Sequence, residues 1–366
     1  MSPERRVLSK LLPSVAGLGL ILCAGGAFVR CVPPDPTDPC IDDEAACPPD
    51  AGLPVDAAAG LDADSTRDGG RDGGDRDAAT APDAGSDAGL ACPSFAMGMA
   101  VGRTPLVTLT ESSGVVAGRR SAGTLWLHND SGAGPRIVAL SSTGALQALY
   151  DLMGATAQDW EDIAIGPGPR AGSSYLYIGD IGDNAMARAD VQVYRVEEPD
   201  VRSGSPTTPT MLPVERFTLV YPDRAHNAET LLVDPLRSDV YIVAKSGDGV
   251  SPVFRAAAPL SSAVPNRLEQ VAVLRFGTAP LSGGRTTTGG DISPRGDEIA
   301  IRTYDAAFLW RRPAGMTVAD ALAGIPCPLP LRVEPQGEAL GFASDGAGYY
   351  TVSEGSNQPL FFYSRR

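Results

Sequence analysis

Histidine is scarce in this chain, and the short motifs of many enzyme classes are missing. The 366 residues include two histidines, His128 and His226, which argues against a zinc site built on several imidazoles. The sequence has no G-x-S-x-G turn, no phosphate-binding glycine loop and no dinucleotide fingerprint. It therefore disfavours a lipase-type hydrolase and gives no sign of a nucleotide-binding enzyme.

The chain also lacks a basic patch. Its formal net charge is −14, and 15 of its 44 acidic residues fall between Pro33 and Ala91, against three arginines there. The rest of the chain is only mildly acidic, and nothing forms the basic stripe that nucleic acid requires. We therefore expect no nucleic-acid partner.

The first 27 residues have the pattern of a signal peptide. Three basic residues precede an apolar run over 11–22, and the small residues Gly25 and Ala27 follow. This pattern predicts export to the cell surface, the periplasm or the extracellular space. A retained membrane anchor and lipid tethering through a cysteine, which would make the protein peripheral to a membrane, stay open as alternatives.

Residues 28–91 are rich in Asp, Ala, Gly and Pro and have few large apolar side chains. Such a segment buries too little surface to offset the entropy lost on ordering, so we predict a disordered spacer. The folded domain then spans residues 92–366.

Export permits disulfides, and the folded region holds two of the six cysteines, Cys92 and Cys327. We predict that they form a bridge; two separate thiols are the alternative. Cys23 belongs to the proposed signal peptide, and a local pair among the three cysteines of the spacer would leave one cysteine over.

A strand signature recurs five times at intervals of about 50 residues, which is typical of a stacked or radial repeat. The copies begin at Ser112, Trp160, Asn227, Thr288 and Gln336. Each opens a run of short β-rich segments bounded by Gly, Pro, Asp and Ser, with about four strands to a unit. The sequence predicts an all-β fold, a single β-propeller of five four-stranded blades.

The last unit has only three strands, and a spare run precedes the first unit at residues 105–110. We predict that this N-terminal strand completes the final blade and closes the ring, which removes open sheet edges. Six blades stay open, because residues 199–226 and 276–287 are long enough to conceal strands. One helix is expected over residues 316–324, with Thr317 as its N-cap.

Two sets of polar residues should surround one mouth of the central channel. In a blade the inner strand begins, and the antiparallel second strand ends, at the same face of the disk. The inner-strand starts contribute Ser113, Asp159, Glu161, Asp162, Glu229, Asp291 and Glu338. The second-strand ends contribute His128, Asn129, Asp130, Asp180, Asp183, Asn184, Lys245, Asp248, Arg302, Asp305 and Glu354.

Crowded carboxylates repel one another unless something offsets their charge. A hard cation such as calcium is one solution, pairing with Arg188, Lys245 or Arg302 is a second, and raised pKa values that could support acid–base chemistry are a third. The acids could instead accept main-chain N–H bonds that tie inner strands together, or simply face channel water.

Several motifs resemble those of exported bacterial β-propellers, most of them uncharacterised. These motifs are HNDSG, DWEDIAIGPG, YLYIGDIGDN, NAETLLVDP, GGDISPRGDEIAIRTY and EPQGEALGF, within residues 105–364. The group is loosely similar to esterase-like-phytase, gluconolactonase-like and SdiA-regulated propellers, of which the lactonase and phytase branches hold calcium or a similar ion on channel acids.

By that resemblance, the residues expected to hold the ion are Glu161, Asp162, Asp180, Asp183, Glu229 and Glu338. Asn184 and Asp291, which belong to the same mouth, complete the expected metal ligands. The expected ligand-binding residues are His128, Asn129, Asp130, Arg188, His226, Lys245, Arg302 and Glu354. The favoured function is a monomeric propeller that binds calcium or another hard divalent cation together with a polar small molecule or a cell-surface component. A metal-dependent hydrolase of a phosphoester, lactone or sugar derivative, and a protein-interaction scaffold, are the alternatives.

Overall fold

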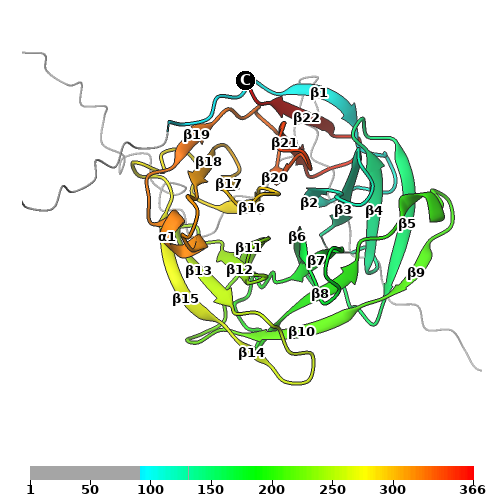
Figure 1. Ribbon diagram of the computed structural model, residues 1–366, viewed down its shortest axis with the longest axis horizontal. Helices are drawn as coiled ribbons and strands as arrows, with labels where there is room; N and C mark the ends of the chain where they lie inside the picture. The colour runs from blue at the N-terminus through cyan, green and yellow to red at the C-terminus, as the bar shows by residue number, and fades with distance from the viewer. Residues whose placement is uncertain (1–90, 131) are drawn as a thin grey trace, which may run out of the picture. The chain divides into compact units, whose positions relative to one another are not determined.

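The computed structural model describes residues 91–130 and 132–366, which form five mainly antiparallel sheets arranged as the blades of a ring (Figure 1). The predicted five-bladed β-propeller is confirmed. The proposed signal peptide, and all of the proposed spacer except Ala91, lie outside the described residues. Within the described part of the chain, no helix is long and apolar enough to cross a membrane.

Each blade presents one strand to the channel and stacks three more outward. The inner strands are β2 (Ser112–Ala117), β6 (Trp160–Pro167), β11 (Ala228–Val233), β16 (Thr287–Ile292) and β20 (Gly337–Phe342). The second strands are β3 (Thr124–Asn129), β7 (Ser174–Asp180), β12 (Val240–Ala244), β17 (Glu298–Thr303) and β21 (Gly348–Ser353). The third strands are β4 (Arg136–Ser141), β8 (Val191–Glu197), β13 (Val250–Ala256), β18 (Ala307–Arg311) and β22 (Pro359–Ser364).

The outer strands are shorter or more exposed, as edges usually are. They are β5 (Leu146–Met153), β10 (Glu215–Val220), β15 (Glu269–Arg275), β19 (Cys327–Leu329) and β1 (Met99–Arg103). Two short strands add to outer edges in parallel, β9 (Thr210–Pro213) beside β5 and β14 (Asn266–Arg267) beside β10. The long connection over 199–226 therefore contains a 3-10 turn, η1 (Val201–Ser203), the edge strand β9 and the outer strand β10 of the second blade, rather than a sixth blade.

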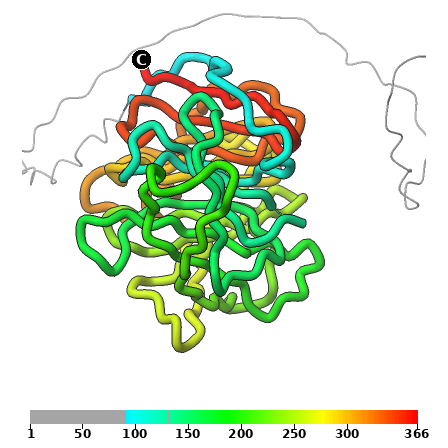
Figure 2. The backbone as a smooth tube through the Cα atoms, turned by 90° about the vertical axis from the view of Figure 1, so that its right-hand side faces the viewer, coloured from blue at the N-terminus to red at the C-terminus, as the bar shows by residue number. Residues whose placement is uncertain are grey.

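An N-terminal strand closes the ring, but it is not the one predicted. β1 pairs antiparallel with β22 of the last blade (Figures 1 and 2), whereas residues 105–110 form turns and loop. Pro105 has no N–H to extend a ladder, and Leu106 and Val107 are 63% and 85% exposed. The apolar composition of this run pointed to a strand that its proline and its exposure do not support.

The N-terminal segment is fixed further by the predicted disulfide. Cys92 and Cys327 are bonded, with their Cα atoms 5.6 Å apart. Since Cys327 begins β19 in the fourth blade and β1 lies in the fifth, residues 92–103 connect the outer edges of two adjacent blades. Phe95 lies between the disulfide and β1, and its ring packs edge-on against that of Tyr349, with the ring centroids 5.1 Å apart.

The hydrophobic core lies between blades rather than along the axis. Each of five clusters of buried side chains draws on two neighbouring sheets. Trp126, Trp160 and Trp310 are at most 1% exposed and belong to these clusters. Trp160 therefore packs between the first two blades rather than lining the channel entrance. The predicted helix is α1 (Val318–Leu322), capped by Thr317 in a capping box with Asp320.

Candidate functional site

All five inner strands carry a β-bulge at the same place, next to the first residue. In each blade the register against the second strand shifts there, so that two inner residues oppose one partner residue. The second residues of the inner strands are Ser113, Glu161, Glu229, Thr288 and Glu338. The bulge thus sets three glutamates and two hydroxyls at equivalent points around one channel mouth.

This register corrects the placement of two predicted metal ligands. Asp162 and Asp291 lie further along their strands, and their carboxylates accept main-chain N–H bonds from the next inner strand: Asp162 from Leu231 at 3.0 Å, and Asp291 from Phe342 at 2.9 Å. Burial raises the pKa of Asp162 well above its usual value and that of Asp291 to about 7, while these N–H bonds oppose the shift. Both acids tie neighbouring blades together.

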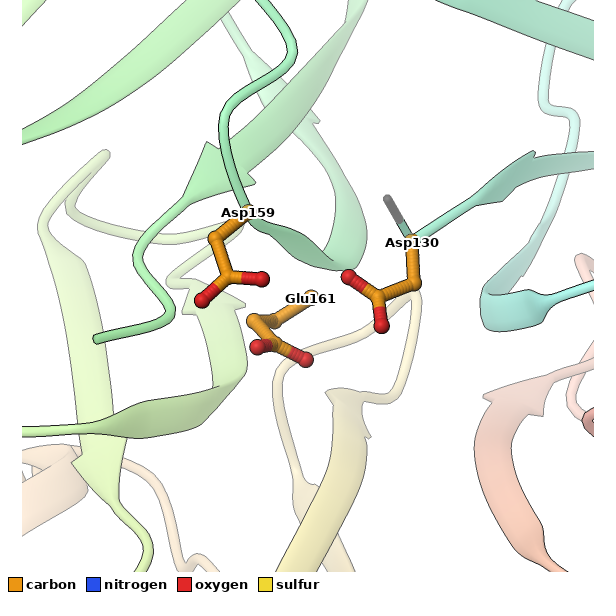
Figure 3. Close-up of side chains that lie close together, drawn as sticks. All are labelled: Asp130, Asp159 and Glu161. Atoms are coloured by element: carbon orange, nitrogen blue, oxygen red, sulfur yellow. The ribbon is translucent and has the colours of Figure 1, made fainter. Parts of the chain in front are cut away.

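Three carboxylates converge at the mouth, those of Asp130, Asp159 and Glu161 (Figure 3). Asp130 follows β3, Asp159 precedes β6, and Glu161 is the bulge residue of β6. One oxygen from each lies within 4.8 Å of the other two. Glu161 is 4% exposed, and its carboxylate has no hydrogen bond or ion pair within residues 91–130 and 132–366. We call these three residues the acid cluster.

A glycine makes room for the acid cluster. Gly182 lies in the loop after β7, and a Cβ added there would overlap Glu161 Oε1 and Asp159 Oδ2. The loop backbone is held close by Arg188, whose Nη1 donates to Gly182 O and to Asp180 Oδ1, both at 2.8 Å. Asp180 in turn accepts the N–H of Asp159 at 3.2 Å. Asp180 and Arg188 therefore position the cluster rather than face a ligand.

The acid cluster is electrostatically costly without a counter-charge. Burial raises the pKa of Glu161 well above its usual value, and the charges of Glu229 and Asp130 add to the shift. Burial also raises the pKa of Asp130 to about 7, reinforced by Asp159. Burial likewise raises the pKa of Asp159, although the charge of Arg188 opposes this shift. One Asp130 oxygen is buried and has no hydrogen-bond partner among the described residues.

A second polar network continues around the rim. Lys245 pairs with Glu229 and donates to Tyr304 Oη at 2.8 Å, and Tyr304 Oη lies 3.5 Å from Glu338. Burial raises the pKa of Glu229 to about 8, although Lys245 opposes the shift. On this side of the mouth an acid is paired with a basic residue of the protein, Lys245, which is one of the alternatives that the sequence left open. Tyr304 follows β17 and was not among the predicted site residues.

Glu354 is half-buried at the rim of the last blade, where Gln336 donates to it. Burial raises its pKa to about 7, and the charge of Glu338 adds to the shift. The Nε2 of Gln336 also donates to Glu338 at 3.1 Å. Gln336 therefore connects two of the predicted rim acids.

Several other predicted residues have structural roles. His128 is fully buried, lies against Trp160 and has a pKa that burial lowers to about 4. Asn129 accepts the N–H groups of Thr110 and Glu111 at 3.0 and 3.1 Å and so anchors the loop before β2.

Arg302 and His226 also depart from the prediction that they bind a ligand. Arg302 is completely buried and donates to Glu334 Oε2 at 2.7 Å. His226 packs between Tyr221 and Phe254 and pairs with Asp223 at 3.0 Å. Both polar groups stabilise packing between structural elements instead of facing a ligand.

Asp183 and Asn184 belong to the loop that contains Gly182. The Asp183 carboxylate accepts the N–H of Arg188 at 2.7 Å, and Asn184 Oδ1 accepts from Asn227 at 3.2 Å. Neither joins the acid cluster. Of the eight expected metal ligands, Glu161 alone belongs to it.

The cluster fits a hard cation. Calcium takes oxygen ligands at about 2.3–2.6 Å, so oxygens up to about 5 Å apart can share one ion. Three carboxylates supply up to six oxygens, and any two of them in their ionised form would balance the charge of a divalent ion. The residues that would hold such an ion are Asp130, Asp159 and Glu161.

Comparison with known proteins adds little. No family model matches the chain, and no curated protein matches it. Among solved structures, the chain is similar to one described as the crystal structure of RRP9 WD40 repeats, at 10% sequence identity and a TM-score of 0.35. That match covers 75% of this chain and all of the other.

Proposed function

We propose that this protein is a binding propeller whose acid cluster holds calcium or another hard divalent cation, and that the ion and the surrounding rim bind a polar ligand. The observation that carries the proposal is the convergence of three carboxylates of which one, Glu161, is 4% exposed and unpaired within the described residues. A buried charge without a partner is costly. A bound cation would remove that cost and order the three side chains together.

The contrast with the rest of the rim supports the choice of site. Glu229 is neutralised by Lys245, and Glu338 receives a hydrogen bond from Gln336 at 3.1 Å. The acid cluster has no such protein partner. A bound cation would therefore offset more unpaired negative charge there than elsewhere at the mouth. We place the polar ligand across the adjoining rim, where Lys245 keeps one N–H beyond the two that it donates to Glu229 and Tyr304.

Thermal melting tests the cation. The purified protein is melted in EDTA and then with calcium, magnesium or manganese at millimolar concentration. A ligand that binds only the folded state stabilises it by mass action, so the wild type should gain several degrees with at least one ion. Glu161→Gln should gain none, because it removes the buried charge at the centre of the cluster.

Glu215→Gln is the matched control, because it makes the same chemical change at a half-exposed glutamate on an outer strand. It should respond to the ion as the wild type does. An unchanged melting temperature of the wild type with all three ions would overturn the proposal, and so would an equal gain in Glu161→Gln.

A hydrolase of a phosphoester, lactone or sugar derivative is the second candidate, favoured by Glu229. Its pKa near 8 allows it to hold or release a proton near neutral pH, and its charge adds to the pKa shift of Glu161. A bound ion would supply Lewis-acid chemistry. A substrate panel tests this candidate: turnover that Glu229→Gln abolishes while ion binding persists would establish it, and no turnover on any member would leave binding as the function.

The cellular setting is also a proposal. The signal-peptide pattern over residues 1–27 favours an exported protein, and the Cys92–Cys327 disulfide is consistent with an oxidising compartment. We therefore place the polar ligand outside the cytosol, as a small molecule or a component of a cell surface. Tracing the chain by cell fractionation tests this location, and a purely cytosolic protein would contradict it.

A further inference from the structure

The opposite end of the channel has a different chemistry. The inner strands β2 and β6 end at Ala117 and Pro167, away from the acid cluster, and a cavity of about 450 Å³ lies there. Its wall includes Arg119, Arg120 and Ser173. This volume is in the range of sites for small molecules.

Arg119 is the unusual group in this wall. Its Nε is buried without a hydrogen-bond partner, and its guanidinium makes no ion pair or hydrogen bond among the described residues. Burial lowers the pKa of Arg119, and the charges of Asp291 and Glu198 only oppose that shift. Because a guanidinium stays protonated in proteins, a partly buried positive charge faces this cavity with its donors unused.

The two nearest acids do not pair with it, because their oxygens are already occupied. Glu198 accepts the main-chain N–H groups of Arg119 and Arg120, at 3.1 and 2.9 Å, as well as the indole N–H of Trp126 at 3.2 Å. Asp291 accepts two main-chain N–H bonds, from Ile292 and Phe342. Glu198 therefore fixes the backbone from which the Arg119 side chain extends without neutralising its charge.

The rest of the wall favours an anion as well. Its one acid, Glu197, is shared by Arg120, at 3.3 Å, and Arg170. Ser173 Oγ accepts from Arg170 Nε at 2.7 Å, which leaves its own O–H free to donate. The cavity thus combines an unpaired guanidinium, a second arginine and a free hydroxyl donor.

We propose that this cavity is a binding site for a small oxyanion, a carboxylate or phosphate group, held by the guanidinium of Arg119 with Ser173 as a second donor. A guanidinium presents parallel N–H groups that match two oxygens of such a group. The site is separate from the acid cluster and does not depend on the cation proposed there.

Calorimetric titration tests the site with two probes, inorganic phosphate and malonate, at constant ionic strength and with EDTA present. The wild type should bind at least one probe saturably. Arg119→Gln should weaken that binding at least tenfold, because it removes the positive charge and the parallel N–H groups of the guanidinium. The identity of the preferred probe then distinguishes a phosphate from a carboxylate ligand.

Arg295→Gln is the matched control, since it removes an equal charge from an exposed arginine in the loop after β16, next to the cavity residue Pro294. It should bind as the wild type does. Absence of saturable binding in the wild type, or equal binding in Arg119→Gln, would overturn the proposal.

A second measurement does not require a variant that folds. The Nε–Hε resonance of Arg119 should shift on addition of the bound probe to the wild-type protein, because an unpaired N–H acquires an acceptor. A resonance that stays in place while the probe binds would place the anion elsewhere and contradict the proposal.

Discussion

Two sets of carboxylates in this propeller look alike in sequence and differ in their partners. Glu334 pairs with the buried Arg302, and Asp162 accepts N–H groups from two inner strands. Asp130, Asp159 and Glu161 lie together at the channel mouth with no cation of the protein paired to them among the described residues. The first set joins elements of the ring, and the second presents charge to the channel.

The difference arises from position rather than residue type. Glu161 and Asp162 are adjacent in the chain, yet the bulge in β6 directs one to the mouth and the other between strands. The propeller therefore uses carboxylates both for structure and, as we propose, for binding. Substitutions that neutralise one acid at a time separate the two uses, because the predicted changes in stability have opposite signs.

Neutralising Glu334 should give the largest effect. Glu334→Gln leaves the guanidinium of Arg302, which is 0% exposed, without its counter-charge, and breaking a buried pair in this way costs about 3–5 kcal/mol. Urea unfolding at neutral pH should show that loss. A loss below about 1 kcal/mol would mean that the carboxylate of Glu334 does not stabilise the ring.

Asp162→Asn should cost less, about 1–3 kcal/mol. The amide keeps one acceptor oxygen but turns an NH₂ group toward one of two main-chain donors, those of Ile163 and Leu231. The same unfolding measurement applies, and the cation response of this variant should survive. Loss of the cation response with stability unchanged would mean that Asp162 binds the cation instead of joining the strands.

Glu161→Gln should have the opposite sign. At pH 8 in EDTA it replaces a carboxyl whose pKa burial raises well above its usual value, and so removes the cost of burying that carboxyl. The free energy of unfolding should therefore rise by about 1 kcal/mol. Urea unfolding of the wild type and the variant, side by side, measures the difference. A destabilisation like that of Glu334→Gln would mean that Glu161 has a structural partner and would break the comparison.

The smallest effect concerns pH. The pKa of Asp130 in the folded protein is raised to about 7, so its stabilising contribution is full below the unfolded pKa near 4 and is lost as the pH rises through 7. Asp130→Asn should therefore be nearly neutral at pH 5 and stabilising, by less than about 1 kcal/mol, at pH 8 in EDTA. Unfolding at both pH values checks this, and an effect that shrinks as the pH rises would contradict it.

The ring could be predicted from the sequence because each blade repeats the same alternation of strands and turns. The position of the mouth followed from the antiparallel order of the first two strands. The bulge could not be predicted, since one extra residue leaves no mark in composition or period. Asp291 was therefore assigned to the mouth, where Thr288 lies instead.

The residue with which each acid pairs could not be predicted from the sequence either. Whether Arg302 faces the channel or Glu334 depends on the path of the loop before β20, and no local pattern specifies that path. Arg119, at the far end of the channel, follows an inner strand rather than preceding one, so the pattern of polar strand starts does not contain it. Gly182 is one of 42 glycines, and only the packed loop shows why its position needs one.

The most direct test of the acid cluster is a crystal structure of the protein grown with calcium, with the ion located by anomalous scattering. One peak should lie at the channel mouth, about 2.3–2.6 Å from an oxygen of each of Asp130, Asp159 and Glu161. The peak should be absent from crystals of Gly182→Ala, in which the added methyl overlaps two of the carboxylates. A mouth with no calcium, or an ion held only by other residues, would show that the acid cluster is not a calcium site.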